Sequence, residues 1–456
     1  MSRALLLQAA IAIGLGLGSV VFVELVRDVY HVVSHYWPPL LKLHKLHHQL
    51  YRKDFSIINL ETYRKAQIYN DAPEAIAMMA AGGLLWWLAQ FYATGWGAMA
   101  TGLGVLYAFG FFVGAIARAQ GWWLESDLTH KPGTLTARPN VWRVNRAYHW
   151  RHHFDETTAY YGGHFTVIDK LLGTSLALKN KTVAVTGASG TLGNALIDQL
   201  VAQGARPIAL TSSEFSHPRA KVVTWAVGQE DALRDCLQHT DILILNHGIN
   251  VHGDRTPEAV QKSLEVNALS SWRLAEIFFS TVTGQSDRAT KELWVNTSEA
   301  EVSPALSPLY EISKRLLGDL VTLRRLDAPC IVRKIVLGPF KSQLNPYGIM
   351  SAVWVAKMAI ALAKRDVRLI IITVNPLTYL LIPLKEIFSV LYFRLFSRPA
   401  LGTVGAGTVG TGTVGTGTVG AGTVGTGTVG TGAVGTGAAV PKPEARATES
   451  AKSRRS

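Results

Sequence analysis

The sequence contains almost no cysteine and comparatively few acidic residues. Its 456 residues include two cysteines, Cys236 and Cys330, which are far apart and form no CxxC pair, so we expect a reducing compartment without a disulfide framework. The 32 acids are outnumbered by 45 lysines and arginines, which gives a formal charge of +13. A basic excess can indicate a nucleic-acid partner. Here 48% hydrophobic residues and a mean hydropathy of +0.18 favour a membrane protein with no nucleic-acid partner.

Composition divides the chain into four zones, and its length exceeds what one core usually organises. Residues 1–178 alternate apolar runs with histidine-rich stretches, and 179–374 alternate strand-like and helix-like patterns. Residues 375–397 are apolar again and predict a membrane-associated helix, either interfacial or a fourth span. Residues 398–456 repeat GTVGA and GTVGT before a basic end. Because glycine recurs too often for a regular element, we predict a disordered tail.

Three apolar runs lie in the first zone, at residues 4–26, 72–92 and 95–117. Each has close to the roughly 20 residues that cross a bilayer. The last two are separated by only Ala93-Thr94, which predicts a tight helical hairpin. The stretches rich in lysine and arginine then fall on one side, which the positive-inside rule makes cytoplasmic. We predict a multi-pass integral membrane protein with its catalytic regions on the cytoplasmic face.

Ten of the 14 histidines precede residue 165, and eight of these form the boxes HVVSH, HKLHH and HWRHH. On a helix, residues three and four positions apart share a face, so each box presents its imidazoles together. Imidazole nitrogens suit iron, zinc, copper and nickel. The spacing therefore predicts a metal centre beneath the bilayer, with these candidate ligands: His31, His35, His44, His47, His48, His130, His149, His152, His153 and His164.

Over about residues 23–176, these boxes resemble the fatty-acid hydroxylase and sterol desaturase superfamily. His130 in LTHKPG stands where that family has a histidine before the last box, and YYGGHFTVIDKLLGTSL is similar to the family's ending, with Tyr160 in place of Asn and Ile168 in place of Trp. The resemblance implies two iron ions that activate O2 for attack on a C–H bond of a membrane lipid. It also implies an external one-electron donor of ferredoxin or cytochrome type. We expect a dry, apolar slot for the lipid, for which four aromatic residues are candidates, unless they are interface anchors: Trp86, Trp87, Trp122 and Trp123.

The second half opens on KTVAVTGASGTLGNALIDQL, a β-branched strand, a glycine-rich turn and a helix. Gly187, Gly190 and Gly193 let the backbone approach a pyrophosphate at the helix N-terminus. The pattern predicts a dinucleotide-binding α/β Rossmann fold. The second strand ends in TSS, without the acid that binds a free ribose 2′-hydroxyl, so we expect NADP(H) rather than NAD(H).

Residues of about 181–374 resemble the short-chain dehydrogenase family through TGASGTLG, NHG, EVNALS, YEISK and GPFKSQLNP. The resemblance implies that Tyr310 is the acid/base, that Lys314 lowers its pKa, that Ser298 polarises the substrate oxygen and that Asn267 holds a relay water. The usual serine position is occupied by Glu299, so either the backbone shifts by one residue or the site is impaired. The implied cofactor-binding residues are Gly187, Ser189, Gly190, Gly193, Asn246, Gly248, Lys314 and Pro339.

Together these patterns predict a multi-domain chain: an α-helical transmembrane domain with histidine boxes, an α/β Rossmann-fold domain and a disordered tail. The favoured function is a bifunctional lipid oxidoreductase, a di-iron hydroxylase or desaturase joined to an NAD(P)-dependent dehydrogenase. Because hydride carries two electrons and no flavin motif is evident, we do not expect the dehydrogenase to reduce the irons. One alternative resembles the plant wax-alkane proteins and converts fatty aldehyde to alkane. Another is a lipid-binding scaffold without catalysis.

Overall fold

A computed structural model describes residues 3–93 and 95–399. It confirms a helical N-terminal region followed by a parallel-sheet α/β domain. The glycine-rich repeat and the basic end, for which the sequence predicts disorder, lie outside the described residues.

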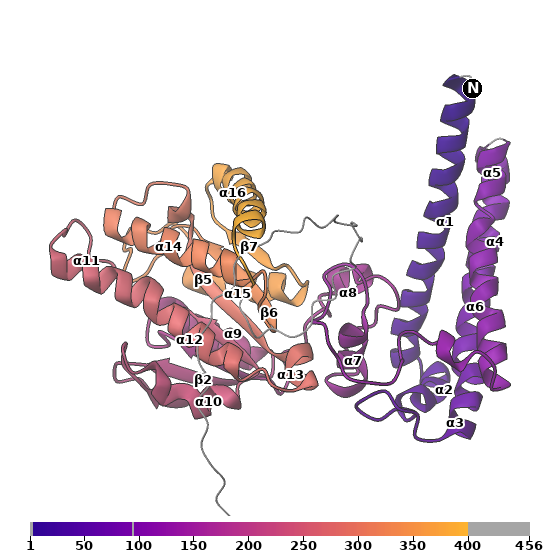
Figure 1. The fold of residues 1–456 in the computed structure, drawn as a ribbon, viewed down its shortest axis with the longest axis horizontal. Helices are drawn as coiled ribbons and strands as arrows, with labels where there is room; N and C mark the ends of the chain where they lie inside the picture. The colour runs from indigo at the N-terminus through magenta and orange to yellow at the C-terminus, as the bar shows by residue number, and fades with distance from the viewer. Residues whose placement is uncertain (1–2, 94, 400–456) are drawn as a thin grey trace, which may run out of the picture. The chain divides into compact units, whose positions relative to one another are not determined.

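Long helices dominate the N-terminal region, where α1, α4 and α6 pack along one another (Figure 1). Among the described residues, three helical stretches are long and apolar enough to cross a membrane: Arg3–Tyr36, Leu60–Tyr92 and Trp96–Ala119. Small residues allow close approach, since a Cβ on Gly104 would lie 2.7 Å from the Ser19 carbonyl oxygen. The helices here are α1 (Arg3–Tyr36), α4 (Ala72–Tyr92), α5 (Trp96–Ala100) and α6 (Leu103–Ala119).

Short helices carry most of the histidine boxes. Pro38 and Pro39 begin α2 one residue after α1 ends, because proline is accommodated in the first turn of a helix but not in its interior. Asn145 caps α7 by accepting a hydrogen bond from the Tyr148 amide. The elements are α2 (Pro38–His48), α3 (Leu60–Ala66), the π-helical η1 (Gln67–Asp71), the 3-10 turn η2 (Leu124–Ser126), α7 (Arg146–Phe154) and α8 (Val167–Leu172).

Within the described chain, seven parallel strands form one sheet of order β3-β2-β1-β4-β5-β6-β7. Side chains alternate between its faces, so Val183 and Val185 pack toward α9 and α15 while Ala184 faces α12 and α14. The strands are β1 (Thr182–Thr186), β2 (Arg206–Thr211), β3 (Lys221–Thr224), β4 (Ile242–Leu245), β5 (Glu292–Ser298), β6 (Ile331–Leu337) and β7 (Leu369–Ile372).

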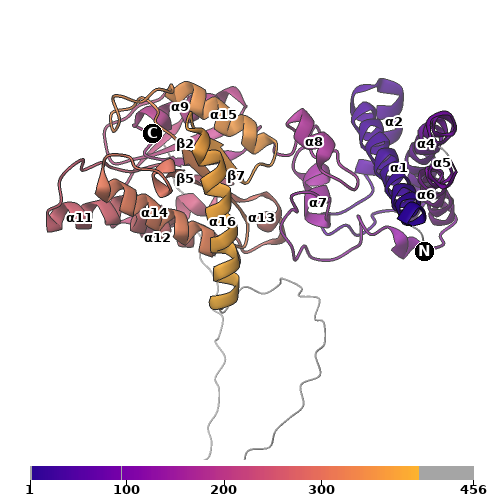
Figure 2. The ribbon, with the colours of Figure 1, turned by 90° about the horizontal axis from the view of Figure 1, so that it is seen from above.

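Helices cover both faces of this sheet, as a doubly wound α/β fold requires (Figure 2). The last helix, α16, packs against α14 and follows β7 after three residues. The elements are α9 (Thr191–Ala202), η3 (Glu230–Leu233), α10 (Arg234–Gln238), α11 (Pro257–Leu264), η4 (Glu265–Leu269), α12 (Ser270–Ser280), α13 (Gln285–Thr290), η5 (Glu299–Glu301), α14 (Pro308–Arg324), α15 (Ala352–Lys364) and α16 (Pro376–Phe396).

A buried arginine joins the two regions. Arg151 on α7 is 1% exposed and donates to the Ala289 carbonyl and to the Glu292 carboxylate at the start of β5. Glu292 also accepts two hydrogen bonds from Arg333 on β6, at 2.7 and 2.9 Å. Burial alone would raise the pKa of Glu292, but the two guanidinium groups lower it to about 2. The histidine-bearing helix and the sheet therefore share one buried ion network.

Neutralising Glu292 should weaken the fold strongly. A Glu292→Gln variant leaves the buried Arg151 without its carboxylate partner and leaves Arg333 paired with Asp366 alone. Breaking a buried ion pair on one side typically costs about 3–5 kcal/mol. We expect a clear fall in the apparent Tm of the detergent-solubilised chain. The matched control is Asp231→Asn, because Asp231 and Arg234 form an ion pair with side chains 82% and 52% exposed, and such pairs contribute little. Equal Tm shifts in the two variants would contradict this account.

Candidate functional site

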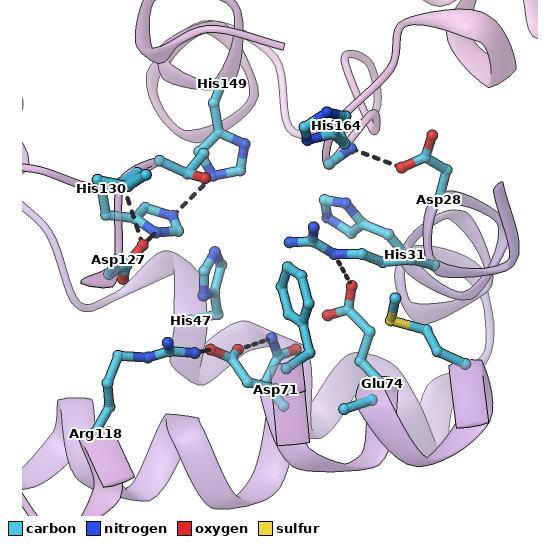
Figure 3. A pocket seen from close by; sticks show the side chains of 18 of the residues that line it. Asp28, His31, His47, Asp71, Glu74, Arg118, Asp127, His130, His149 and His164 are labelled. Carbon is cyan, nitrogen blue, oxygen red and sulfur yellow. Dashed lines mark hydrogen bonds and ion pairs between the residues drawn. The ribbon is translucent and has the colours of Figure 1, made fainter. Parts of the chain in front are cut away.

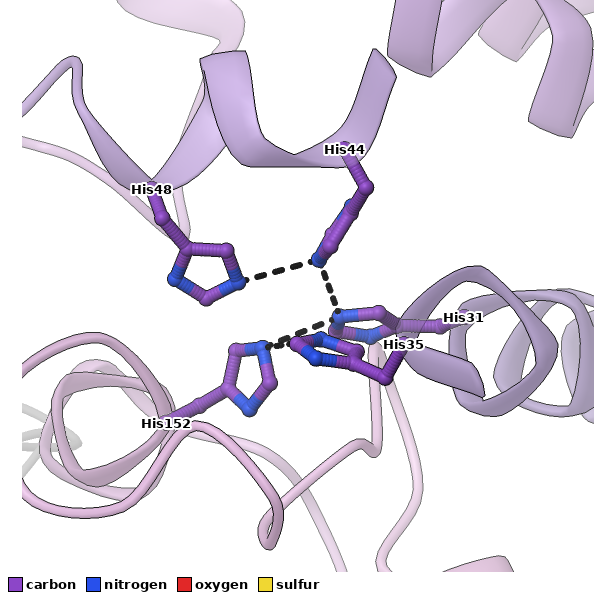
Figure 4. Close-up of side chains that lie close together, drawn as sticks. All are labelled: His31, His35, His44, His48 and His152. Carbon is purple, nitrogen blue, oxygen red and sulfur yellow. Dashed lines mark hydrogen bonds between the residues drawn. The ribbon is translucent and has the colours of Figure 1, made fainter. Parts of the chain in front are cut away.

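Nine histidines from separate parts of the N-terminal region converge in two groups. The ligand atoms of each group lie within 4.8 Å of one another. Figure 4 shows the rings of the first group, which come from α1, α2 and α7 and turn toward a common point. The first group is His31, His35, His44, His48 and His152, and the second is His47, His130, His149 and His153.

The Nε2 atoms are the ones that face each other. The Nε2 of His31 lies 3.0 Å from that of His152 and 3.2 Å from that of His44. In the second group, the Nε2 of His149 lies 2.8 Å from that of His130 and 3.0 Å from that of His153. Since only one nitrogen of a neutral imidazole carries a proton, so many Nε2 atoms cannot all be satisfied by each other.

Hydrogen bonds outside the groups fix several ring orientations. His31 and His152 donate through Nδ1 to the carbonyls of Tyr161 and Ala159, each at 2.7 Å. The Nδ1 atoms of His44 and His130 lie 2.8 Å from oxygens of Asn70 and Asp127, respectively. A proton on Nδ1 leaves the Nε2 lone pair free for a metal.

Burial keeps these imidazoles neutral. Desolvation and the neighbouring His44 and His35 lower the pKa of His48 to about 2. The pKa values of His47, His152 and His153 also lie well below the usual value, first because of burial and then because of nearby rings. Neutral imidazoles with converging lone pairs are the donor set that metal ions of the iron and zinc type require. The residues present therefore fit a pair of metal ions.

His164, the tenth predicted ligand, is in neither group. Its ring lies 4.6 Å from that of Phe165, and the residue lines a cavity next to the histidines (Figure 3). The spacing of the boxes predicted eight of the nine converging histidines, and the family resemblance added His130. His164 was predicted only from its position after the last box.

The cavity beside the histidines is lined by charged as well as apolar side chains, whereas the expected slot was purely apolar. It encloses about 310 Å³. Arg27 pairs with Glu74 at 2.7 Å and Arg118 lies 3.5 Å from Asp71, and all four residues line the cavity (Figure 3). The four tryptophans suggested for a slot do not line it, and their exposed fractions of 46–67% fit interface anchors: Trp86, Trp87, Trp122 and Trp123.

A second cavity, of about 280 Å³, lies over the glycine-rich turn between β1 and α9. Gly187 has a φ of +62°, and a Cβ on Gly193 would lie 2.2 Å from the Gly187 carbonyl oxygen. The turn therefore needs glycine at both positions. Of the predicted cofactor-binding residues, five line the cavity: Gly187, Ser189, Gly190, Asn246 and Gly248. Pro339 does not line it and accepts a hydrogen bond from the Ile349 amide at 2.9 Å.

His247, which was not among the predicted site residues, also lines this cavity. Its Nδ1 lies 2.8 Å from the Thr186 hydroxyl, and its ring meets that of Trp225 edge-on at 5.3 Å. Burial, and next the charge of Lys314, lowers the pKa of His247 to about 3. His247 stands between Asn246 and Gly248 in the NHG segment, and this position was the sequence signal that could have identified it.

The described residues that line the cavity include neither an acid nor a lysine or arginine. The preference for NADP(H) over NAD(H) therefore stays a prediction.

The four predicted catalytic residues come together at the carboxyl end of β5. Tyr310 lies in the first turn of α14, and the Lys314 Nζ one turn later is 5.8 Å from its ring centre. Burial raises the pKa of Tyr310, and a hydrogen bond with Ser298 partly offsets this. Burial lowers the pKa of Lys314 to about 8, against the opposing charge of Glu301. The side chain of Asn267 accepts a hydrogen bond from the Ile249 amide at 2.8 Å and donates one to the Ile249 carbonyl at 3.0 Å.

The side chains of Ser298 and Glu299, the two residues at the serine position of the family pattern, point in different directions. Ser298 is the residue that contacts Tyr310. The carboxylate of Glu299 points elsewhere and accepts hydrogen bonds from the hydroxyls of Thr373 and Thr378. The side chain that faces Tyr310 therefore lies one position earlier in the sequence than in the family pattern.

The family described as "NAD dependent epimerase/dehydratase family" matches residues 183–308. A short-chain dehydrogenase from Burkholderia cenocepacia in complex with NADP is 17% identical, with 49% of this chain and all of the other covered and a TM-score of 0.40. A short-chain dehydrogenase from Sphingobium yanoikuyae in complex with NADPH is 15% identical, with coverages of 48% and 97% and a TM-score of 0.40.

A much stronger match is to a curated protein of Synechocystis named monoglucosyldiacylglycerol epimerase. The two are 51% identical over 403 residues, which is 85% of this chain and 98% of the relative. A match of this length extends over both the helical region and the α/β domain. The family match within 183–308 does not reach the histidine boxes, so their hydroxylase-type chemistry stays a prediction. The chain belongs to the family of the monoglucosyldiacylglycerol epimerase.

Proposed function

We propose that this protein inverts one hydroxyl-bearing carbon in the sugar of a glucosyldiacylglycerol, with a nicotinamide dinucleotide bound in the α/β domain. The observation that carries the proposal is the grouping of Tyr310, Lys314 and Ser298 beside the phosphate-binding turn. It occurs in a chain 51% identical to an enzyme named for that reaction. This narrows the dehydrogenase activity expected from the sequence to a reaction with no net oxidation.

Three side chains would act on the hydroxyl of the sugar carbon that is inverted. Tyr310 takes the proton from the sugar hydroxyl, and Ser298 donates a hydrogen bond to the same oxygen. The ammonium of Lys314 favours the phenolate form of Tyr310 by its charge. A bound dinucleotide supplies reversible hydride transfer, which oxidises the carbon to a ketone and reduces it again. Inversion requires that the keto-sugar present its other face before reduction, after which Tyr310 returns the proton.

A second proposal concerns the nine imidazoles. Their converging Nε2 atoms support two bound metal ions, which we propose to be iron. Two irons would supply O2 activation for attack on a lipid C–H bond, with electrons from an external ferredoxin- or cytochrome-type donor. Epimerisation moves no net electrons, so its balance does not call for this centre.

The epimerase proposal is tested with substrate whose sugar carries deuterium on all its ring carbons. Because the same bound cofactor takes and returns the hydride, we expect the epimerised sugar to keep its full deuterium content, without accumulation of reduced dinucleotide. Mass spectrometry of the released sugar and absorbance measure the two. Tyr310→Phe should lower the rate at least about 100-fold, and Tyr92→Phe, at an exposed position, should not. Stoichiometric reduction of the dinucleotide would contradict the proposal.

The pH dependence should reflect Lys314. Its pKa is lowered to about 8, so its charge is present below that pH and is lost as the pH rises through it. Since the charge assists Tyr310, we expect kcat/KM for epimerisation to decline above about pH 8. A Lys314→Arg variant stays charged, and its decline should begin at higher pH. An unchanged alkaline limb in this variant would show that Lys314 does not set it.

Metal analysis tests the second proposal. We expect about two transition-metal ions per purified chain, because the donors form two groups. His152→Ala removes a ligand of the first group and should lower the metal content, whereas His217→Ala in the α/β domain should leave it unchanged. Plasma mass spectrometry gives the ratio. Equal metal content in the two variants would mean that the metal is bound elsewhere.

A further inference from the structure

Exposed apolar side chains gather at the edge of the sheet where the catalytic residues lie. In a parallel sheet the carboxyl ends of all strands share one edge, and β5, β6 and β7 end there at Ser298, Leu337 and Ile372. The segments that follow these strands carry large apolar side chains with high exposed fractions: Leu306 at 95%, Leu344 at 41%, Tyr347 at 93%, Ile349 at 74% and Leu377 at 61%.

Helix α16 extends this surface. It begins at Pro376, just after β7, and its exposed apolar side chains recur at intervals of three and four residues. Such spacing forms a continuous stripe along one side of a helix. The stripe contains Leu377, Leu380, Leu381, Leu384, Ile387, Phe388, Leu391, Tyr392 and Leu395.

Charged residues in the middle of α16 fasten it to α14 and β6. Glu386 accepts hydrogen bonds from Lys334 at 2.7 Å and from Arg325 at 2.8 Å. Lys385 donates to Glu301 at 2.8 Å and lies 2.8 Å from Asp319. Because Lys334 is fully buried, withdrawing Glu386 would leave its charge under-compensated. The helix therefore lies along the α/β domain (Figures 1 and 2).

The start of α16 is connected to the catalytic strand. Thr378 donates to Glu299, the residue after Ser298, at 3.2 Å, and Asn375 donates to the Ser303 hydroxyl at 3.4 Å. Leu377 lies between these two anchors in the sequence. The apolar surface thus begins next to the catalytic group, and its position is fixed relative to Tyr310.

We propose that this apolar rim, formed by Leu306, Leu344, Tyr347, Ile349 and the stripe of α16, docks on the surface of a lipid bilayer. There it lets the sugar head group of a membrane lipid reach Tyr310 while the acyl chains stay among their neighbours. This rests on the proposed epimerase function.

Three observations favour a bilayer as the occupant. The same chain has three helices long and apolar enough to cross a membrane, which keeps a bilayer within reach. The exposed Arg394 and Arg398 lie at the end of the stripe, where they suit anionic lipid head groups. A second copy seated on the rim would instead cover the approach to Tyr310.

Kinetics with two substrates test the delivery of the head group. The full chain in phosphatidylcholine vesicles is assayed with long-chain glucosyldiacylglycerol and with a dihexanoyl analogue that is dissolved in water. For Ile387→Glu/Leu391→Glu we expect kcat/KM to fall at least about tenfold on the vesicle substrate and to stay within about twofold on the soluble one. The matched control, Val222→Glu on β3, should change neither. If the double variant kept the wild-type kcat/KM on both substrates, or lost it equally on both, the proposal would be overturned.

Depth measurements test the docking without relying on activity. In a Cys236→Ser background, a fluorophore is attached to a Phe388→Cys or a Tyr347→Cys variant, and brominated phosphatidylcholine serves as the quencher. We expect quenching at both sites. A fluorophore on an Asp231→Cys variant, at the exposed ion pair with Arg234 outside the rim, should not be quenched. Absence of quenching at the rim would overturn the proposal. Protection of the fluorophore that increases with protein concentration would also overturn it, because it would indicate a second copy on the rim. Quenching in a chain without epimerase activity would leave the docking intact and remove the proposed function.

Discussion

The ion network around Glu292 is the constraint that links the two halves of this protein. Its carboxylate is held by Arg151 from the histidine-bearing α7 and by Arg333 from β6. A carboxylate with no exposed surface is tolerable only when paired in this way. Glu292 begins the strand that ends at Ser298, and Arg151 directly precedes His152. One strand and one short helix thus connect the imidazole groups to the dehydrogenase-type site through buried contacts.

Local patterns were sufficient to predict the main elements. The three apolar runs and the strand–turn–helix at Gly187 depend on composition and spacing alone. The attachment of α16 could not be predicted, because Lys385 and Glu386 stand out in an apolar run while their partners, such as Lys334 and Glu301, are far away in the sequence. A charge inside an apolar segment signals a partner without identifying it.

The candidate sites show the same division. Helical spacing predicted eight of the nine converging imidazoles, and family motifs pointed to the ninth, His130, and to Tyr310, Lys314 and Asn267. Spacing could not exclude His164, show that Ser298 rather than Glu299 faces Tyr310, or predict that the Arg27–Glu74 pair lines the neighbouring cavity. These outcomes depend on long-range packing. The motifs predicted hydride chemistry but could not distinguish the proposed epimerisation from a net oxidation. Both reactions can use the same proton-transferring group, and they differ in whether the keto-sugar rotates and is reduced again before release.

The buried pairs at both borders of the α/β domain determine where the chain can be divided for study. A fragment ending after β7 would lose Glu386 and leave the ammonium of Lys334 facing Glu301 alone inside the protein. A fragment beginning at β1 would lose Arg151 and open the far end of the sheet. A soluble piece suited to crystallisation should therefore retain α7 and α16, even though neither belongs to the nucleotide-binding core.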